Sequence, residues 1–333
     1  MNASVGNNVQ SRQMVACAVK KTAACRCTRV GPLCFRAAWV YGRGMDGPAP
    51  NLASTLRDAT DALTPVSATP RLDAELLMAH ALGIDRSAML LRQHDLAVPA
   101  GFAAMLARRV ADEPVAYITG MQAFWDLNLH VTPDVLIPRA DSETVIEVAI
   151  AGFAGRDAPA RILDLGTGSG ALLLAALSVF GDAQGVGIDA SAAALAVASG
   201  NAARLGLDGR ATFERRDWTL DGWADGLGQF DLILCNPPYI EDDTPLALMV
   251  ARHEPHSALF AGPDGLRDYR ILLKTLKKLL KTTGIAVFEI GFNQSKSVAK
   301  LGTEAGFTSE LTHDLSGNPR VLRFSLGIAQ PNR

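Results

Sequence analysis

An apolar run that stops at an amide, two prolines and a phenol contains the residues most suited to chemistry. Residues 230–240 read F-D-L-I-L-C-N-P-P-Y-I, so a buried strand is expected to end at Asn236. Asn236 and Pro237 each precede a proline, which biases both toward extended geometry. The pattern predicts a stiff row of acceptors. An –NH₂ group can donate to the Asn236 side-chain oxygen and to a backbone carbonyl, that of Pro237, while Tyr239 stacks on its plane.

This acceptor row suits methylation of a planar nitrogen, in an amide or in an exocyclic base amine. The lone pair of such a nitrogen is delocalised, so catalysis must come chiefly from positioning it and from favouring a pyramidal transition state. No strong base is needed beforehand, because the proton becomes acidic only after the methyl group has transferred. The segment alone leaves the substrate open between adenine in DNA, a base in RNA and a glutamine side chain. It also leaves open a merely stiff loop.

A glycine-rich turn offers a place for the second reactant. Residues 162–170 read I-L-D-L-G-T-G-S-G and end a strand in a turn that opens a helix. Glycines let the backbone approach a ligand closely, and a helix N-terminus offers unpaired N–H groups. The spacing G-x-G-x-G differs from the G-x-G-x-x-G of dinucleotide sites. The next strand, 185–189, ends in Asp189, which can accept both ribose hydroxyls of an adenosine. The alternative is a tight turn beside a solvent-exposed aspartate.

The loop and its acidic partner resemble the first motif of S-adenosylmethionine-dependent methyltransferases of the Rossmann-like class. The resemblance implies that residues 166–170 line the methionine and ribose side of the cofactor and that Asp189 holds the ribose. Asp217-Trp218 matches the segment that flanks adenine in that class, although Trp218 fits a core aromatic equally well. The residues predicted to bind S-adenosyl-L-methionine are Gly166, Thr167, Gly168, Ser169, Gly170, Asp189, Trp218 and Asn236. The residues predicted to be catalytic and to bind substrate are Asn236, Pro237, Pro238 and Tyr239.

Short β-rich runs that alternate with helical patterns must position these motifs. This alternation is typical of a parallel sheet covered on both faces, in which ligands bind at the carboxyl ends of the strands. We predict an α/β fold, a Rossmann-like class I methyltransferase domain with a mostly parallel seven-stranded sheet, over residues 141–333. The expected strands are 161–165, 185–189, 211–214, 230–235, 285–290 and a closing antiparallel pair, 309–313 and 320–326. The expected helices lie near 170–179, 191–205, 267–282 and 294–306.

Ahead of this domain, residues 50–113 have apolar side chains at helical spacing. Thr69-Pro70 predicts an N-cap followed by proline at the first helical position, and Asp85 can open another helix. We therefore expect a small all-helical N-terminal domain that binds the substrate, 45–117. Pro114, Tyr117 and Gly120 are expected to interrupt the helical pattern. A connecting β-hairpin or linker follows, 118–140.

The first 44 residues differ from the rest, with seven Lys or Arg and no Asp or Glu. Either Met45 is the true start, or this leader is a transit or accessory segment. Four of the five cysteines lie in it at spacings that match no familiar zinc pattern, and we predict no metal. Only Cys235 falls in the folded region, which favours a reducing compartment. The expected location is the cytoplasm, or the mitochondrion if residues 1–44 are a transit segment.

The net charge and the lengths of the apolar runs indicate which classes of partner to expect. A net charge of −2 argues against binding nucleic acid mainly through phosphate neutralisation. The longest apolar run, 171–180, is roughly half of what a membrane-spanning helix needs. His253 and His256 lack a third ligand and are expected to be solvated or packed. We therefore expect no membrane partner and no direct nucleic-acid substrate.

Stretches outside the sheet narrow the choice of nitrogen. P-V-A-Y-I-T-G at 114–120 and V-L-I-P-R-A-D-S-E at 135–143 closely resemble the peptide chain release factor glutamine N5-methyltransferase family, as do 254–259, 264–266 and 288–291. The resemblance is collinear over about 50–327. It implies the same helical domain, hairpin and methyltransferase domain. It also implies S-adenosylmethionine-dependent methylation of the glutamine in the Gly-Gly-Gln loop of class I release factors, which would be the protein partner.

Two positions depart from that family pattern. Ala140 stands where a second proline is usual, and Ser142 stands where threonine is usual. The Ser142 hydroxyl is still expected to cap the following helix. The role of Arg139 stays open: it fits a surface ion pair as well as a role in the site, and we do not count it as catalytic.

Three other functions compete with this prediction. A ribosomal-protein glutamine methyltransferase shares the sheet motif, but its N-terminal pattern differs. A DNA or RNA amino-methyltransferase would need a basic recognition region. A non-catalytic nucleotide-binding adaptor would have no use for N-P-P-Y at a strand end.

Overall fold

The computed structural model describes residues 51–327, and the predicted leader, 1–44, lies outside these residues. The first part is helical, as predicted, and its helices pack around an apolar core that includes Leu56, Leu77, Met78 and Phe102. Asn51 caps the first helix by accepting a hydrogen bond from Ser54 N at 2.8 Å. The helices are α3 (Leu52–Leu63), α4 (Pro70–Leu82), α5 (Arg86–Leu91) and α6 (Phe102–Val110).

The start of α4 differs from the predicted cap. Pro70 does occupy the first helical turn, but Thr69 makes no side-chain bond to the backbone of the helix. Its hydroxyl donates instead to Asp73 Oδ1 at 3.1 Å. The other oxygen of Asp73 accepts from Arg109 Nε on α6 at 2.8 Å, so this buried carboxylate holds two helices together. Thr69 therefore supports the ion pair between Asp73 and Arg109 and does not cap the helix. At α5 the expected cap is present, since Asp85 accepts from Ala88 N.

A short helix and a hairpin connect the two parts. The predicted interruption at 114–120 is instead the helix α7 (Val115–Thr119), which ends at Gly120 with a left-handed φ of 70°. The predicted hairpin follows as β1 (Met121–Phe124) and β2 (Leu127–His130). The Asn201 amide bonds both the N–H and the C=O of His130, at 2.7 and 2.9 Å. The hairpin is thereby fixed to the sheet domain.

The sheet has seven strands in the order β5-β4-β3-β6-β7-β9-β8. The neighbours from β5 to β7 are parallel, and β9 pairs antiparallel with β7 and β8, as predicted. The expected helix 267–282 ends at Leu279, because β7 already begins at Leu280, which pairs with Phe230. The strands are β3 (Arg161–Leu165), β4 (Gln184–Asp189), β5 (Ala211–Arg215), β6 (Phe230–Cys235), β7 (Leu280–Glu289), β8 (Phe307–His313) and β9 (Pro319–Leu326).

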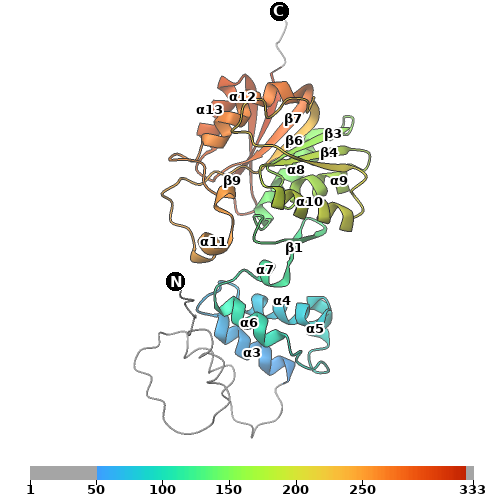
Figure 1. Ribbon diagram of the computed structural model, residues 1–333, viewed down its shortest axis with the longest axis vertical. Helices are drawn as coiled ribbons and strands as arrows, with labels where there is room; N and C mark the ends of the chain where they lie inside the picture. Colours follow the sequence, from blue (N-terminus) through green and yellow to red (C-terminus); the bar gives the residue numbers. More distant parts are fainter. Residues whose placement is uncertain (1–50, 328–333) are drawn as a thin grey trace, which may run out of the picture. The chain divides into compact units, whose positions relative to one another are not determined.

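Helices cover both faces of this sheet (Figure 1), and each face has its own apolar core. One core contains residues of α8 (Glu143–Phe153) and α9 (Ala171–Val179), with Ala202 of α10 (Ala192–Arg204). The other contains residues of α12 (Arg267–Leu279) and Val298 of α13 (Ser295–Glu304). Three short helices lie in the connections: η2 (Ala140–Ser142), α11 (Leu248–His253) and η3 (His256–Ala258). Within 51–327 no helix is long and apolar enough to cross a membrane.

Candidate active site

The strand register brings the two sequence motifs together. Leu165 of β3 lies opposite Ile188 of β4 and Cys235 of β6, and Cys235 lies opposite Phe288 of β7. The chain reverses its direction of winding between β3 and β6, which is where open α/β sheets bind ligands. The residues one step further along these four strands form the strand-end row. In sheet order they are Asp189, Gly166, Asn236 and Glu289.

The glycine loop takes a backbone path that suits glycine. Gly166, Gly168 and Gly170 have φ angles of 74°, 54° and 84°, in the left-handed region that other residues rarely adopt. Asp189 holds this loop, because its Oδ2 accepts from Gly168 N at 3.0 Å. Its Oδ1 accepts from Ser191 N at 2.9 Å. Burial raises the pKa of Asp189 above its ordinary value, and these backbone bonds oppose the rise. The aspartate is therefore partly buried and built into the loop, unlike the solvent-exposed residue of the alternative interpretation.

Trp218 lies against the same loop. A Cβ atom on Gly166 would come within 3.0 Å of the Trp218 ring, so only glycine allows this close approach. The indole N–H donates to Asp268 Oδ1 at 2.7 Å. The ring also packs against the core under α12. Trp218 is thus a packed aromatic whose free edge faces the glycine loop.

Asp164, which sequence reasoning did not select, lies beneath this loop. Its Oδ2 accepts from the Thr167 hydroxyl at 2.7 Å, whereas its buried Oδ1 has no hydrogen-bond partner within the described residues. Burial raises the pKa of this carboxyl to about 7, although the Thr167 bond lowers it. Asp164 lines a cleft together with Gly166, Gly168 and Asn236. An unpaired buried acceptor in such a cleft suits a ligand that carries an N–H or ammonium group. Its only sequence signal is a carboxylate inside the apolar run I-L-D-L.

Asp164 gives a stability prediction. Because its folded pKa lies above the ordinary value of 3.8, its stabilising contribution is complete at low pH and is lost as the pH rises through about 7. Asp164→Asn cannot ionise, so the variant should become more stable than the native protein at alkaline pH, by on the order of a few kcal/mol. Thermal melts at several pH values would measure this. Asp182→Asn, at an exposed position, is the control, and parallel curves for native protein and Asp164→Asn would contradict the prediction.

The Asn-Pro-Pro-Tyr segment presents its amide oxygen as a free acceptor. Asn236 Nδ2 donates to Ser142 Oγ at 3.3 Å, and no donor in the described part of the chain bonds Oδ1. Pro237 and Pro238 are buried, which fixes the turn. The Tyr239 hydroxyl donates to Glu289 Oε1 at 3.4 Å. The Tyr239 carbonyl accepts from Gln294 Nε2 at 2.9 Å. Asn236 Oδ1 is therefore available to accept a hydrogen bond, whereas the Tyr239 carbonyl is already occupied.

Ser142 does not cap α8, contrary to expectation. It follows a 3₁₀ turn, and its φ of −69° and ψ of −15° are helical, whereas a capping residue needs extended geometry to turn its oxygen onto the helix N–H groups. Its hydroxyl accepts from Asn236 instead. Glu143, the first residue of α8, accepts from Trp125 N at 2.8 Å and so fastens the hairpin to this loop.

Arg139, whose role the sequence left open, forms an ion pair with a buried partner. Its guanidinium bonds Glu254, whose side chain is completely buried, and Glu254 also accepts from Ile137 N at 3.4 Å. The Tyr117 hydroxyl donates to the Val135 carbonyl at 2.7 Å. These bonds fix the loop 135–143 as one wall of the cleft, which Arg139 also lines.

His256 is exposed, which agrees with the expectation that it is solvated or packed; its ring nitrogen contacts the Ala251 carbonyl at 2.8 Å, and the ring lies edge-on to Phe260.

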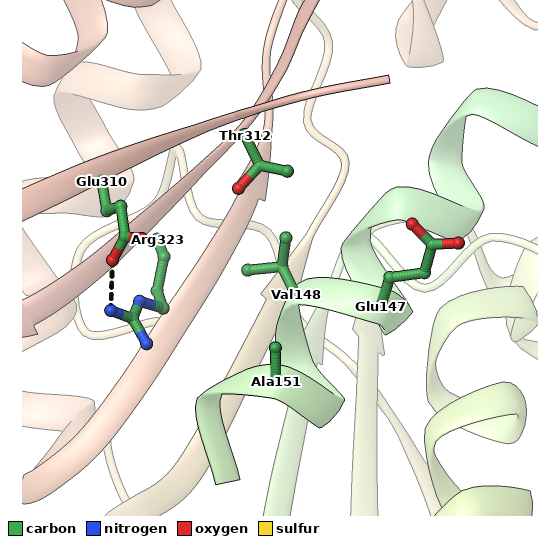
Figure 2. Close-up of a pocket in the computed structure, with 6 residues that line it drawn as sticks. All are labelled: Glu147, Val148, Ala151, Glu310, Thr312 and Arg323. Atoms are coloured by element: carbon green, nitrogen blue, oxygen red, sulfur yellow. Dashed lines mark hydrogen bonds and ion pairs between the residues drawn. The ribbon is translucent and has the colours of Figure 1, made fainter. Parts of the chain in front are cut away.

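A second hollow lies away from the strand-end row. Figure 2 shows it between α8 and the hairpin β8–β9, with an ion pair between Arg323 and Glu310. It contains neither a glycine loop nor a residue of the Asn-Pro-Pro-Tyr segment. The cleft beside Asn236 is therefore the candidate active site.

Comparison with known proteins agrees with this geometry. Residues 54–120 match the PrmC N-terminal domain family, and residues 157–309 match a methyltransferase domain family. A release factor glutamine methyltransferase of Rhodospirillum rubrum is 43% identical over 259 residues, which cover 76% of this chain and 78% of that protein. The chain belongs to the release factor glutamine methyltransferase family. Another family member, from Caulobacter vibrioides, is 40% identical over 79% of this chain and 90% of its own length.

Membership of this family confirms the resemblance found in the sequence and the α/β methyltransferase fold with its helical N-terminal part. Among solved structures, a methyltransferase from Pyrococcus furiosus has a TM-score of 0.43 at 17% identity, covering 68% of this chain and all of that one. The match to the methyltransferase domain family, 157–309, includes the glycine loop, Asp189 and the Asn-Pro-Pro-Tyr segment.

Proposed function

We propose that this chain is an S-adenosylmethionine-dependent enzyme that methylates the side-chain nitrogen of the glutamine in the Gly-Gly-Gln loop of class I release factors. The observation that carries the proposal is the free Oδ1 of Asn236, which opens onto a cleft that the glycine loop also lines. The family to which the chain belongs supports the choice of glutamine and of release factors.

The residues around the glycine loop fit S-adenosylmethionine, which when bound supplies an electrophilic methyl group on a sulfonium. Glycine at three of the five loop positions leaves room for a close approach, and the loop leads directly into the N-terminus of α9. Asp189 keeps carboxylate lone pairs beyond those used by Gly168 and Ser191 and can accept ribose hydroxyls. The unpaired Oδ1 of Asp164 can accept from the amino group of the methionine part. The Trp218 edge can border the adenine.

The Asn-Pro-Pro-Tyr segment would hold the glutamine amide. One N–H donates to Asn236 Oδ1 and the other to the Pro237 carbonyl, while Tyr239 stacks on the amide plane. Each acceptor would hold one N–H of the amide by a hydrogen bond. The two hydrogen bonds would favour the pyramidal geometry that the nitrogen needs in the transition state. Because the turn is rigid, little freedom is lost when the amide enters.

The remaining parts of the chain complete the proposal. In the proposed division the helical domain that binds the release factor is 45–117, the connecting segment is 118–140 and the catalytic domain is 141–333; of these, 45–50 and 328–333 lie outside the described residues. The match of 54–120 to the PrmC N-terminal domain favours a release factor over a ribosomal protein or a nucleic-acid amine. A cytoplasmic location agrees with Cys235, a buried free thiol. A mitochondrial location would depend on residues 1–44, which lie outside the described part.

Incubation with methyl-labelled cofactor and a purified class I release factor tests this function. Peptide mapping should place the label on the glutamine of the Gly-Gly-Gln loop. A release factor with alanine in place of that glutamine is the control and should take up no label. Label on a ribosomal protein, on DNA or on RNA, and none on the release factor, would overturn the proposal.

A further inference from the structure

One buried amide connects three loops at the carboxyl edge of the sheet. Gln294 is 6% exposed, and its Nε2 donates to the Tyr239 carbonyl at 2.9 Å and to the Gly265 carbonyl at 3.1 Å. Its Oε1 accepts from Gly291 N at 3.0 Å. Tyr239 follows β6, Gly291 follows β7, and Gly265 belongs to the connection between these strands. One side chain therefore joins the Asn-Pro-Pro-Tyr segment to two neighbouring loops.

The orientation of this amide follows from its partners. Two carbonyl oxygens need donors and the Gly291 N–H needs an acceptor, so only the –NH₂ group can face Tyr239 and Gly265. Gln294 is also the N-cap residue of α13, yet its side chain makes no bond to that helix. The side chain of a capping residue commonly bonds the first N–H groups of its helix. Here it bonds the loop that carries Tyr239 instead.

Two glycines make room for these contacts. A Cβ atom on Gly265 would collide with the Tyr239 carbonyl oxygen and would come within 2.7 Å of Gln294 Nε2. A Cβ atom on Gly291 would come within 2.8 Å of Gln294 Oε1. The backbone thus closes on the Gln294 amide from two sides and leaves no space for a larger residue at either position.

The peptide group that joins Tyr239 to Ile240 is held at both edges. Its C=O accepts from Gln294, and its N–H, that of Ile240, donates to the Leu259 carbonyl at 2.9 Å. The two proline rings fix the φ angles just before it. A turn held in this way keeps the Tyr239 ring and the Asn236 side chain in one fixed arrangement.

We propose that Gln294 is a positioning residue for methyl transfer, which holds the Tyr239 carbonyl so that the Tyr239 ring and the Asn236 oxygen stay aligned on the substrate amide. This inference rests on the proposed function, because it concerns how the glutamine amide is held. The Tyr239 carbonyl is occupied, whereas no donor in 51–327 bonds the Pro237 carbonyl. An –NH₂ group that enters the turn is therefore directed to Asn236 Oδ1 and to the Pro237 carbonyl.

Substitutions of Gln294 test the inference. Gln294→Glu keeps the shape and the acceptor for Gly291 N, but the ionised carboxylate has no donor for the Tyr239 carbonyl. We expect kcat for release-factor methylation to fall about 10- to 100-fold, because small displacements of reacting groups cost this much. The KM for the release factor and the dissociation constant of S-adenosylmethionine should change little. Gln294→Met, which is of similar length and bonds neither carbonyl, should show the same pattern.

Gly265→Ala tests the same contact from the other side. It leaves Gln294 unchanged but places a Cβ atom against the Tyr239 carbonyl oxygen, which must then shift. This variant should lower kcat in the same way, again with little change in KM or in cofactor affinity. Because Gly265 has a left-handed φ of 64°, the substitution also strains the backbone, and thermal melts are measured for every variant.

Arg210→Ala is the matched control. Arg210 precedes β5 at the amino ends of the strands, and its guanidinium donates to the carbonyls of Leu177, Phe180 and Ala183 at 2.9 to 3.2 Å. The variant loses as many bonds from a side chain to the backbone as a Gln294 variant, but at the edge of the sheet opposite the cleft. It should lower the melting temperature and keep the native kcat.

The outcomes are distinct. A native kcat in Gln294→Met, or a loss no larger than that of Arg210→Ala at a similar loss of stability, would overturn the inference. A change confined to cofactor affinity would contradict it as well. If Gln294→Glu fails to fold, Gln294→Met and Gly265→Ala decide, since neither adds a charge. If the native protein does not label the release factor, the proposed function fails; if it does and the Gln294 variants label it equally fast, only this inference fails.

Discussion

Asn236→Ala should lower kcat for release-factor methylation by about 10² to 10³-fold while leaving the dissociation constant of S-adenosylmethionine nearly unchanged. The side chain supplies the free Oδ1 that we expect to accept one N–H of the glutamine amide. This bond strengthens as the nitrogen becomes pyramidal and its protons become acidic, so its loss should be felt mainly in the transition state. Single-turnover rates and a separate cofactor titration would measure the two quantities.

Asn128→Ala is the matched control for this variant, because Asn128 is exposed on β2 and makes no side-chain hydrogen bond within the described residues. It should keep the native rate. If Asn236→Ala retained native turnover, the acceptor role of Asn236 would be wrong. A large loss of cofactor affinity without a loss of turnover at saturation would instead make Asn236 a cofactor ligand alone.

The second large effect is expected at Asp189. Asp189→Ala should weaken S-adenosylmethionine binding by about 10² to 10³-fold, because it removes a charged acceptor and also takes away the partner of two part-buried N–H groups, those of Gly168 and Ser191. With cofactor at saturation, kcat should fall much less. Calorimetric titration and the KM for cofactor would both report the change.

Asp182→Ala, another aspartate of the sheet domain but fully on the surface, serves as its control. Asp189→Asn should lie between the native protein and Asp189→Ala, since one carbonyl oxygen remains to accept. An unchanged dissociation constant in Asp189→Ala would remove its ribose role.

The fold was largely predictable because the strands are apolar runs that end at residues which interrupt a strand. The runs that end at Leu165, Ile188 and Cys235 are mostly apolar, and each stops at a glycine or a polar residue, namely Gly166, Asp189 and Asn236. The start of β7 was missed, since Leu280 continues the apolar stripe of α12 and no breaker precedes it.

The site was predictable only where the residue type and its neighbours in the sequence indicate a function. Glycines at a turn and an amide before two prolines are such cases. Asp164 and Glu289 are not, because an acid inside an apolar run shows neither its burial nor its unpaired oxygen. The role of Arg139 was left open because its partner, Glu254, is 115 residues away in the sequence. Ser142 and Thr69 were each predicted to cap the nearest helix, and both predictions were wrong. The Ser142 hydroxyl bonds the Asn236 side chain instead, and the Thr69 hydroxyl bonds the Asp73 side chain.

The register between β3 and β6 has an implication for how this scaffold could change its substrate. Gly166 and Asn236 follow directly opposed residues of two central strands, so the separation between methyl donor and acceptor is a property of the hydrogen-bonded ladder. A slip of one residue would turn every side chain of a strand to the opposite face and destroy both cores. The distance between the methyl donor and the acceptor is therefore fixed by the strand pairing. A change of substrate would require changes in the loops that line the cleft, such as 135–143, while the pairing of the strands stays the same.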